Sequence, residues 1–474
     1  MNPRLQTVRR TIAAVAILAA LARAGTTPSP ASLPSDTEIR QILLDRIDVQ
    51  HKSVGIVVGI ISAEGRRVIS YGQLDTGDSR PVNGDTVFEI GSLTKIFTSL
   101  LLADMVTRGE VSLSDPVSKF LPGVKLPERA GRSITLLDLA TQTSGLPFWP
   151  SNFPSTSNGE AYAEYSADQL FDFLATYELP RDIGSQWSYS NLGMGLLGMA
   201  LSHRAGKDYE SLVRERITAP LGMENTAITL RQSMKVNVAV GHETNLHPAP
   251  DWNVPLFAGA SSLRSSVNDM LKFLATTMGY VKSPLQPAIA LMLETRRPAP
   301  LVKAEQALGW WVIGQGDDQV MAHGGRTFGY ASYIAWDAKT RIGVVALSNA
   351  VIPVQDIVMH LLRPEQPLVK AADARAHTEI ALDPRLFDSY AGQYRTATGL
   401  AVAVERQGEA LMIQLPSAPK LRLHPETERD FFIAESDLQV TFQTDARGGA
   451  TSVIVHYSGK DIPATRVQSA SATR

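Results

Sequence analysis

Two pairs of apolar, β-branched segments stand near the two ends of the first 350 residues. In the first pair, VGIVVGIIS (54–62) and RVISY (67–71) flank AEGR; in the second, YASYIAW (330–336) and IGVVALS (342–348) flank DAKTR. Runs of this kind around turn-forming residues predict β-hairpins. Between them, residues 110 to 290 have a mostly helical pattern broken by Pro- and Gly-bearing loops. We therefore predict an α+β fold: an antiparallel sheet built from both ends of the domain and flanked by helices, with a helical subdomain.

The pattern changes after residue 363. Residues 364–382 read as a linker, and short alternating runs follow: LAVAV, LMIQL, KLRLH, DFFI, LQVTF and SVIVHY. Such runs, separated by Gly- or Asp-bearing turns, are typical of small antiparallel β domains. We predict a main domain over 37–363 and a small all-β, barrel-like C-terminal domain over 383–468. Its role stays open between a structural or dimer-forming module and one that narrows access to a cleft.

The N-terminus has the pattern of an export signal. The basic start MNPRLQTVRR precedes the apolar run TIAAVAILAALA and Ala22-Arg23-Ala24, which fits an A-x-A cleavage site. The run is too short for a stable membrane anchor, although an uncleaved anchor is the alternative. We predict a signal peptide over 1–24, a Pro- and Ser-rich linker over 25–36, and a periplasmic or secreted protein with no integral membrane span after cleavage. Asp36 is expected to cap the helix that follows.

The composition narrows the classes of function. The chain has 474 residues, a net charge of −2 and no basic block, which argues against nucleic-acid binding. It has no cysteine, which excludes disulfides, thiolate metal sites and a cysteine nucleophile. Hydrophobic residues make up 44% and charged residues 19%, as in a globular protein with a substantial core. We predict neither a cofactor nor a metal, and the sequence leaves the oligomeric state open.

One lysine stands in an otherwise apolar helical segment. FEIGSLTKIFTSLLL (88–102) places Lys95 three residues after Ser92, on the same face of a helix that should end near Gly109. A serine hydroxyl becomes a nucleophile when a base takes its proton, and a buried amine one turn away can do so because burial lowers its pKa. The alternative is an amphipathic surface helix with its lysine in water.

Two further polar groups have suggestive positions. YSN at 189–191 precedes a helical pattern, so Tyr189 would stand at a loop-to-helix corner and could relay a proton, while the Asn191 amide could hold the lysine and a substrate. The alternative is an N-cap asparagine beside a packed tyrosine. SVN at 266–268 is a rival triplet, but it reads more simply as a helix start.

His323, Gly324 and Gly325 precede the last predicted hairpin. Glycines there would let a substrate approach a strand edge closely, whereas the alternative is a turn between strands. The segment PFWPSNFPSTSNG (147–159) has no helical or strand period and reads as a long surface loop. Its aromatic residues either form a wall of a substrate cleft or anchor the loop.

With these residues in place, the chain resembles the serine β-lactamase and penicillin-binding protein superfamily, specifically its class C β-lactamase and DD-peptidase branch. The three signatures of that branch, Ser-x-x-Lys, Tyr-x-Asn and a Lys/His-x-Gly triplet, occur in order over about 38 to 350. Several linking stretches are also similar to the family: FEIGS (88–92), LATQTSGLP (139–147), QWSYSNLG (186–193) and FAGASSLRSSVNDMLKFL (257–274). The C-terminal domain resembles the small β domain appended to some members.

The resemblance implies a role for each matching residue. Ser92 matches the acylated nucleophile, Lys95 its proton acceptor, and Tyr189 the general base and acid. Asn191 matches the residue that orients substrate and lysine. The oxyanion hole would be formed by the backbone N–H groups of Ser92 and Arg326.

Two departures from the family pattern affect the expected substrate. Thr94 stands where class C β-lactamases usually carry Ser or Ala, and His323 replaces the lysine that helps bind a substrate carboxylate. A neutral histidine is a weaker anion partner, and Arg326 is our hypothesis for the missing charge. We expect an exported serine hydrolase that forms an acyl-enzyme with a β-lactam or a D-Ala-type peptidoglycan peptide. The alternatives are a carboxylesterase or D-amino-acid amidase, and a binder of cell-wall peptide that does not turn over.

Overall fold

The computed structural model describes the chain from residue 33 to residue 467 with short gaps. The described ranges are 33–154, 159–369, 379–397, 399–415, 420–433, 438–445, 447–457 and 460–467. The chain divides into a short unit, Met1–Ser35, and a large unit, Asp36–Arg474. The expected signal peptide and most of the expected linker over 25–36 therefore lie outside the described residues. Within the described ranges, no helix is both long and apolar enough to cross a membrane.

A nine-stranded antiparallel sheet organises the main domain, with the strand order β3-β2-β1-β13-β12-β11-β10-β9-β8. Its two predicted hairpins are present and meet at the centre, because Ile56 in β1 pairs with Ser348 in β13 and Ile61 with Gly343. Both ends of the domain thus build one sheet, as predicted. The strands are β1 (Gly55–Ser62), β2 (Gly65–Asp75), β3 (Asp78–Pro81), β8 (Arg296–Ala299), β9 (Ala304–Ala307), β10 (Trp311–Ile313), β11 (Val320–Arg326), β12 (Ala331–Asp337) and β13 (Ile342–Ser348).

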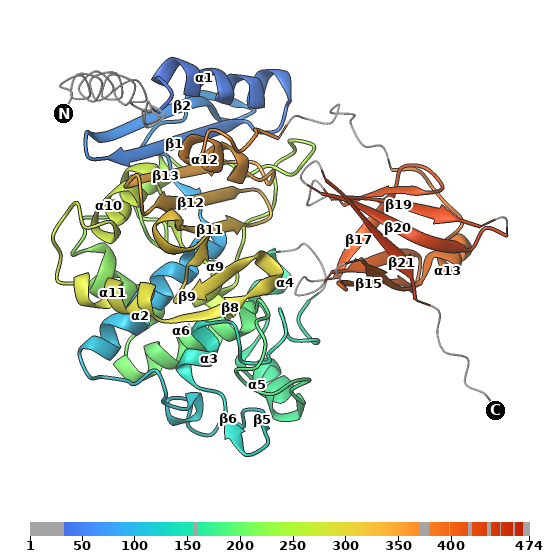
Figure 1. Cartoon of the computed structure of the whole chain (residues 1–474), viewed down its shortest axis with the longest axis horizontal. Coiled ribbons are helices and arrows are strands. Elements are labelled where there is room, and N and C mark those ends of the chain that lie inside the picture. Colours follow the sequence, from blue (N-terminus) through green and yellow to red (C-terminus); the bar gives the residue numbers. More distant parts are fainter. Residues whose placement is uncertain are drawn as a thin grey trace, which may run out of the picture. The chain divides into compact units, whose positions relative to one another are not determined.

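Helices cover both faces of this sheet (Figure 1). One face packs on α10 (Val267–Thr277), where a Cβ on Gly59 of β1 would come within 2.5 Å of the Val267 side chain. The opposite face carries α1 (Asp36–Leu44) and α12 (Gln355–Leu362). Arg46, in the π-helical turn Asp45–Val49 that follows α1, forms a buried ion pair with Asp356 of α12. β1 is therefore buried from both sides and has the continuous apolar sequence GIVVGII.

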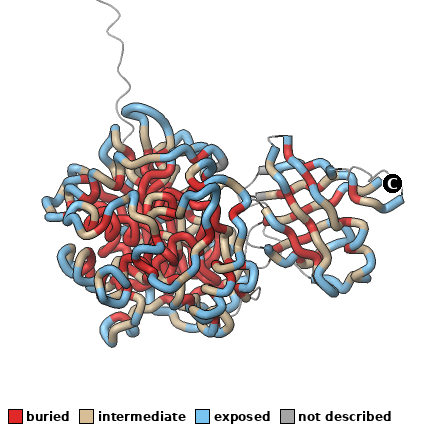
Figure 2. The backbone as a smooth tube through the Cα atoms, turned by 90° about the horizontal axis from the view of Figure 1, so that it is seen from below, coloured by how far each residue is buried: buried red, intermediate tan, exposed pale blue. Residues whose placement is uncertain are grey.

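The helical subdomain predicted between the hairpins is present. Its helices are α2 (Thr94–Thr107), α3 (Leu136–Ala140), α4 (Gly159–Ala163), α5 (Ala167–Thr176), α6 (Asn191–Ala205), α7 (Tyr209–Val213), α8 (Gln232–Lys235), α9 (Ala258–Ser261) and α11 (Gln286–Glu294). The long loop expected after Pro147 contains no regular element over 147–154. Asp36 is the first residue of α1 rather than its cap, so that expectation was wrong. Figure 2 shows the buried residues concentrated in the interior of this domain.

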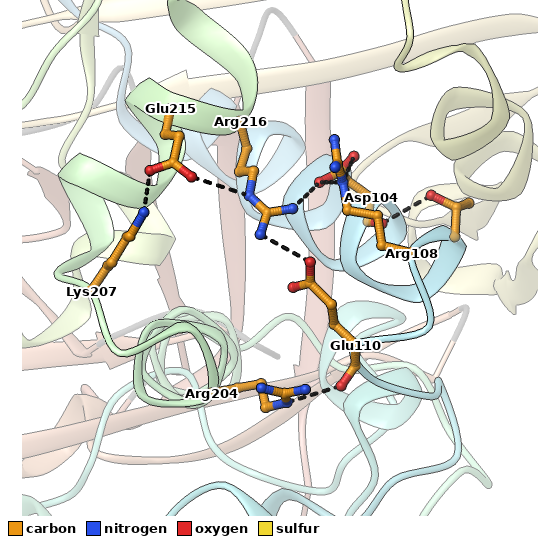
Figure 3. A network of polar contacts seen from close by, with 8 residues as sticks. Asp104, Arg108, Glu110, Arg204, Lys207, Glu215 and Arg216 are labelled. Carbon is orange, nitrogen blue, oxygen red and sulfur yellow. Dashed lines mark hydrogen bonds and ion pairs between the residues drawn. The ribbon is translucent and has the colours of Figure 1, made fainter.

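A network of charged side chains fastens the far end of α2 (Figure 3). The Asp104 carboxylate is almost fully buried and accepts hydrogen bonds from Arg108, one turn later, and from Arg216, 3.1 Å away in the π-helical turn Arg214–Thr218. Arg216 also contacts Glu110 at 2.9 Å. Because a buried carboxylate is costly unless it is paired, this network fixes α2 against the helices that follow it.

The C-terminal strands close into an eight-stranded antiparallel barrel, which confirms the predicted barrel-like fold. Apolar side chains of the strands form its core, and Tyr390 of the preceding helix joins them by stacking on Phe442 with ring centroids 4.4 Å apart. Closure removes exposed strand edges. The elements are the helix α13 (Phe387–Tyr390) and the strands β14 (Gly392–Thr396), β15 (Ala401–Gln407), β16 (Ala410–Gln414), β17 (Lys420–Pro425), β18 (Asp430–Phe432), β19 (Gln439–Thr444), β20 (Ala450–Tyr457) and β21 (Lys460–Arg466).

Candidate active site

Lys95 is buried in the core of the main domain. A short 3-10 turn, Gly91–Leu93, carries Ser92 and leads into α2, whose residues are buried on every side from Thr94 to Met105. Only 1% of Lys95 is exposed. A helix that is apolar all round belongs to a core rather than to a surface, so the interpretation of Lys95 as a solvated surface lysine was wrong.

Three oxygen atoms surround the Lys95 amine. Nζ lies 2.9 Å from Ser92 Oγ, 2.7 Å from Asn191 Oδ1 and 2.9 Å from the backbone oxygen of Ala260. The amide and backbone oxygens can only accept, so they take two N–H groups of the amine. The third direction of the tetrahedral nitrogen points at the serine hydroxyl. A neutral amine would therefore present its lone pair to the Ser92 O–H group.

Burial favours this neutral form of the amine. Removal from water lowers the pKa of Lys95 well below its usual range. No carboxylate is among its hydrogen-bond partners to restore the charged form. The site thus holds a serine hydroxyl beside a basic lone pair, which is the arrangement that activates a weak nucleophile.

The loop before α6 places Tyr189 and Asn191. The Ser190 hydroxyl caps α6 by accepting from the Gly193 N–H at 2.8 Å, while the Ser190 N–H donates to Gln142 Oε1 at 2.7 Å. Asn191 is the first helical residue, so the alternative that it acts as the N-cap was wrong; its side chain turns inward to Lys95 instead. The triplet at 266–268 does start a helix as expected, with a serine cap on α10.

The Tyr189 ring closes the site over the amine. Lys95 Nζ lies 4.8 Å from the centroid of this ring, and the tyrosine hydroxyl shares a hydrogen bond with Ser92. Burial raises the pKa of Tyr189, and the bond with Ser92 only partly offsets this. The phenol therefore keeps its proton at neutral pH, so Tyr189 can donate or relay a proton more readily than it can act as an anionic base.

His323 lies within β11 rather than in a turn, which corrects the alternative drawn from the sequence. Its ring stacks on Trp311 with centroids 4.6 Å apart, and Nδ1–H donates to the Gly324 oxygen at 2.7 Å. Burial, followed by the nearby Lys95, lowers the pKa of His323 to about 3. The ring is therefore neutral at physiological pH and supplies no positive charge to the site.

The N–H group of Arg326 faces the open side of β11. Thr327 N–H donates to the Tyr330 oxygen at 3.1 Å, so these two residues form a hydrogen-bonded pair across the hairpin turn. Pairs alternate along antiparallel strands, so the neighbouring Arg326 does not bond to β12 and its N–H points the other way. On that side, β10 pairs with β11 only over 320–322. The Arg326 side chain is exposed.

β11 lies directly against the turn that carries the serine. A Cβ on Gly91 would come within 2.8 Å of the Arg326 backbone nitrogen, and one on Gly325 within 2.1 Å of the Ile90 oxygen. The Ser332 hydroxyl in β12 donates to the same Ile90 oxygen at 2.9 Å. The packing of the protein therefore requires a glycine at position 325, whether or not a substrate also approaches the strand there. These contacts hold the two backbone segments of the expected oxyanion hole side by side.

The hydroxyl of Thr94 fixes the other side of this turn. It donates to the Gly91 oxygen at 2.7 Å and accepts from the Leu263 N–H at 3.1 Å. Thr94 therefore bonds both to the serine turn and to the segment that supplies Ala260. Thr94 differs from the expected Ser or Ala, and its hydroxyl makes one hydrogen bond as donor and one as acceptor in this position.

A cleft opens above Ser92. The main-domain residues that line it are Ser92, Phe148, Trp149, Tyr162, Asn191, Trp252, Ser261, Trp311, Gly324, Gly325, Arg326, Thr327, Phe328, Ala331, Ser332, Tyr333, Pro353, Val354 and Gln355. Phe148 and Trp149 thus belong to the cleft wall, which was one of the two interpretations of their loop. Phe148 also stacks on Tyr189, with centroids 5.9 Å apart, and its backbone oxygen accepts the Asn191 N–H.

Sequence reasoning missed several residues that shape the site. The Ala260 oxygen, Gln142, Trp311 and Ser332 act through backbone position or through packing across long sequence distances, and no local pattern marks them. Gln142 and Ala260 carried a signal through the family resemblance, since they lie in its LATQTSGLP and FAGASSLRSSVNDMLKFL stretches. Within the described ranges, no cluster of His, Asp and Glu has the arrangement of a metal site.

Comparisons with known proteins show the family of the chain. A model of the Beta-lactamase family matches residues 37–366, and a model described as a domain of unknown function (DUF3471) matches residues 376–466. The D-alanyl-D-alanine-carboxypeptidase/endopeptidase AmpH of Escherichia coli (strain K12) is 32% identical over 231 residues, which are 48% of this chain and 59% of that relative. The match thus spans less than two thirds of AmpH.

Two further relatives extend the similarity. Penicillin-binding protein 4* of Bacillus subtilis (strain 168) is 24% identical over 467 residues, covering 90% of this chain and 98% of the relative. The crystal structure of a class C beta lactamase from Rhodobacter sphaeroides superposes with a TM-score of 0.58 at 27% identity, covering 66% of this chain and 94% of that one. Because the family model spans more than half of the chain and a member has the same fold, this chain belongs to the Beta-lactamase family.

Proposed function

We propose that the protein is an exported serine hydrolase that forms an acyl-enzyme on Ser92. The observation that carries the proposal is the Lys95 amine, buried, with two acceptors on its N–H groups and the Ser92 hydroxyl on its third side. In this proposal the main domain over 37–363 carries the activity, and the barrel domain over 383–468 takes no part in the chemistry. No metal or cofactor takes part in the proposed steps.

The residues divide the proton transfers between them. Lys95 takes the Ser92 proton as the Ser92 oxygen attacks the substrate carbonyl carbon. The oxyanion that forms is stabilised by the N–H groups of Ser92 and Arg326, each contributing about 3 kcal/mol. When the bond to the leaving group breaks, Tyr189 donates its O–H proton to the departing nitrogen or oxygen and regains one from the Lys95 ammonium. Water then attacks the ester, and the same groups carry its proton in reverse.

The substrate we propose is a β-lactam or a D-Ala-type peptidoglycan peptide. The names of the relatives support this class, and the cell-wall location that it requires agrees with the export signal expected from the sequence. The neutral His323 cannot attract a substrate carboxylate, and the exposed Arg326 guanidinium is the group of β11 that can. Asn191 would orient the substrate amide together with Lys95.

The neutral histidine also favours a second candidate. A histidine without charge at this position suits a leaving group that carries no carboxylate, so hydrolysis of carboxylic esters or D-amino-acid amides is the alternative. A third reading, a binder of cell-wall peptide, predicts acylation without release.

Turnover on three substrates tests these candidates together. The mature protein and its Ser92→Ala variant are compared on benzylpenicillin, an N-acyl-D-Ala-D-Ala peptide and p-nitrophenyl acetate. We expect hydrolysis of the penicillin or the peptide by the wild type and none by the variant. Hydrolysis of the ester alone would replace the proposal with the esterase, and full activity of Ser92→Ala would reject both.

A further inference from the structure

Four aromatic rings from four separate segments meet in the cleft. Trp149 comes from the loop after α3, Tyr162 from α4, Trp252 from the loop before α9, and Phe328 from the turn between β11 and β12. Their ring centroids lie 6.5 Å apart for Trp149 and Trp252, 5.6 Å for Tyr162 and Trp252, 5.4 Å for Tyr162 and Phe328, and 4.8 Å for Trp252 and Phe328. We call these four residues the aromatic wall.

Hydrogen bonds and ring stacking with neighbouring residues hold Trp252 and Trp149 of the aromatic wall in place. The Trp252 indole N–H donates to the Ser261 hydroxyl at 2.8 Å, and its backbone N–H donates to the buried Glu89 carboxylate at 3.3 Å. The Trp149 ring stacks on Phe153, with centroids 4.7 Å apart. Rings fixed in this way lose little conformational entropy when a ligand binds, so they form a prepared apolar surface.

The aromatic wall lies at one end of the cleft. β11 contains His323, whose ring is 6.4 Å from that of Tyr189, and ends at Arg326. Phe328 follows in the turn after the strand. At about 3.3 Å per residue, His323 and Arg326 are some 10 Å apart along the strand. Tyr189 donates a proton to the leaving group in the proposed mechanism, so the leaving group lies at the His323 end. The acyl part of the substrate then extends towards Phe328.

We infer that the aromatic wall is the acyl subsite and that the protein selects substrates whose acyl group carries an aromatic ring. This inference rests on the proposed function, because it uses the direction of acyl transfer across Ser92. Aromatic rings pair edge-to-face or offset with centroids 4.5–7 Å apart, and the wall offers four ring surfaces of this kind. A small acetyl group would leave them uncovered.

Matched esters measure this selectivity directly. p-Nitrophenyl phenylacetate and p-nitrophenyl acetate share one leaving group and differ only in the acyl ring. After correction for their uncatalysed rates, we expect kcat/KM to favour the phenylacetate by on the order of ten- to a hundredfold. In Phe328→Ala and Trp252→Leu this ratio should fall towards one. In Tyr280→Ala, which removes an aromatic ring outside the cleft, the ratio should equal that of the wild type.

A wild-type ratio near one, or an unchanged ratio in both wall variants, would overturn the inference. Phe328→Leu repeats the test if the alanine variant does not fold. If neither ester is hydrolysed, the acyl-enzyme proposal is judged by the penicillin and the peptide, and the subsite is tested by binding. Tryptophan fluorescence of the Ser92→Ala protein should then saturate with N-phenylacetylglycine and not with N-acetylglycine; no response to the former would also overturn the inference.

Discussion

Replacing Lys95 with methionine removes the amine while keeping a side chain of similar length in a tightly packed core. In this account Lys95 is the base that takes the Ser92 proton, and a positioned general base contributes typically 10²–10⁴-fold to the rate. Lys95→Met should therefore lower kcat/KM by about 10²- to 10⁴-fold, which is a loss of about 3 to 6 kcal/mol in transition-state stabilisation at 1.4 kcal/mol per tenfold change. Lys95→Arg should be equally impaired, since a guanidinium does not lose its proton.

The same substitution should change stability much less than activity. Lys95→Met leaves the oxygens of Asn191 and Ala260 without their donor, and each hydrogen bond lost costs about 1 kcal/mol. The variant no longer has to bury an amine, which offsets part of that loss. Thermal unfolding should therefore show a small shift, and the loss of activity can be assigned to chemistry.

The pH dependence provides the sharper assay. Burial lowers the pKa of Lys95, so in the wild type the amine is neutral, and active, down to a pH well below 10.4, the usual pKa of lysine. As the pH falls through the lowered pKa, the amine gains a proton and kcat/KM falls. Between the two pKa values the unfolded chain binds the extra proton, so wild-type stability rises with pH there, and Lys95→Met should lack this slope. A variant that keeps kcat/KM within tenfold and shows the same acid limb would refute the role of Lys95.

Three other substitutions test separate parts of the account. Gly325→Ala places a Cβ within 2.1 Å of the Ile90 oxygen and should lower kcat/KM at least tenfold by moving β11 off the serine turn; unchanged kinetics would show that the contact relaxes at no cost. Arg326→Gln should raise KM for benzylpenicillin roughly tenfold and leave KM for p-nitrophenyl acetate unchanged, whereas equal effects on both would remove its carboxylate role. Arg216→Met leaves the buried Asp104 with one partner (Figure 3) and should lower the free energy of unfolding in urea by about 2 kcal/mol; an unshifted midpoint would contradict this.

The hairpins and the barrel could be predicted because their signals are local. The apolar runs around AEGR and DAKTR and the alternating segments after Leu386 each predict a strand from a pattern of a few consecutive residues. The last three strands at one side of the sheet, β10, β9 and β8, could not be predicted, because they are three or four residues long and include RRPA and AEQA, which have no strand pattern. Their place in the sheet is decided by tertiary contacts alone.

The residues of the site likewise include some whose positions follow from local sequence and others whose positions depend on tertiary packing. Ser92 and Lys95 are one helical turn apart, so their proximity follows from spacing. Trp311 reaches the site only through the pairing of β10 with β11, and Ala260 only through the packing of α9 beside α2, which no local pattern reports. The neutral state of His323 likewise depends on burial beneath Trp311, so the sequence could raise the question of its charge but not answer it.

The central claim is that Ser92 becomes acylated, and intact mass spectrometry tests it most directly. The mature protein is mixed with benzylpenicillin, quenched in acid at intervals and digested to locate any adduct. We predict a mass increase equal to one penicillin on the peptide that contains Ser92, which appears within the time of turnover and is absent in Ser92→Ala. An adduct that persists in Ser92→Ala, or penicillin consumed by the wild type with no adduct on that peptide at any time, would contradict the account.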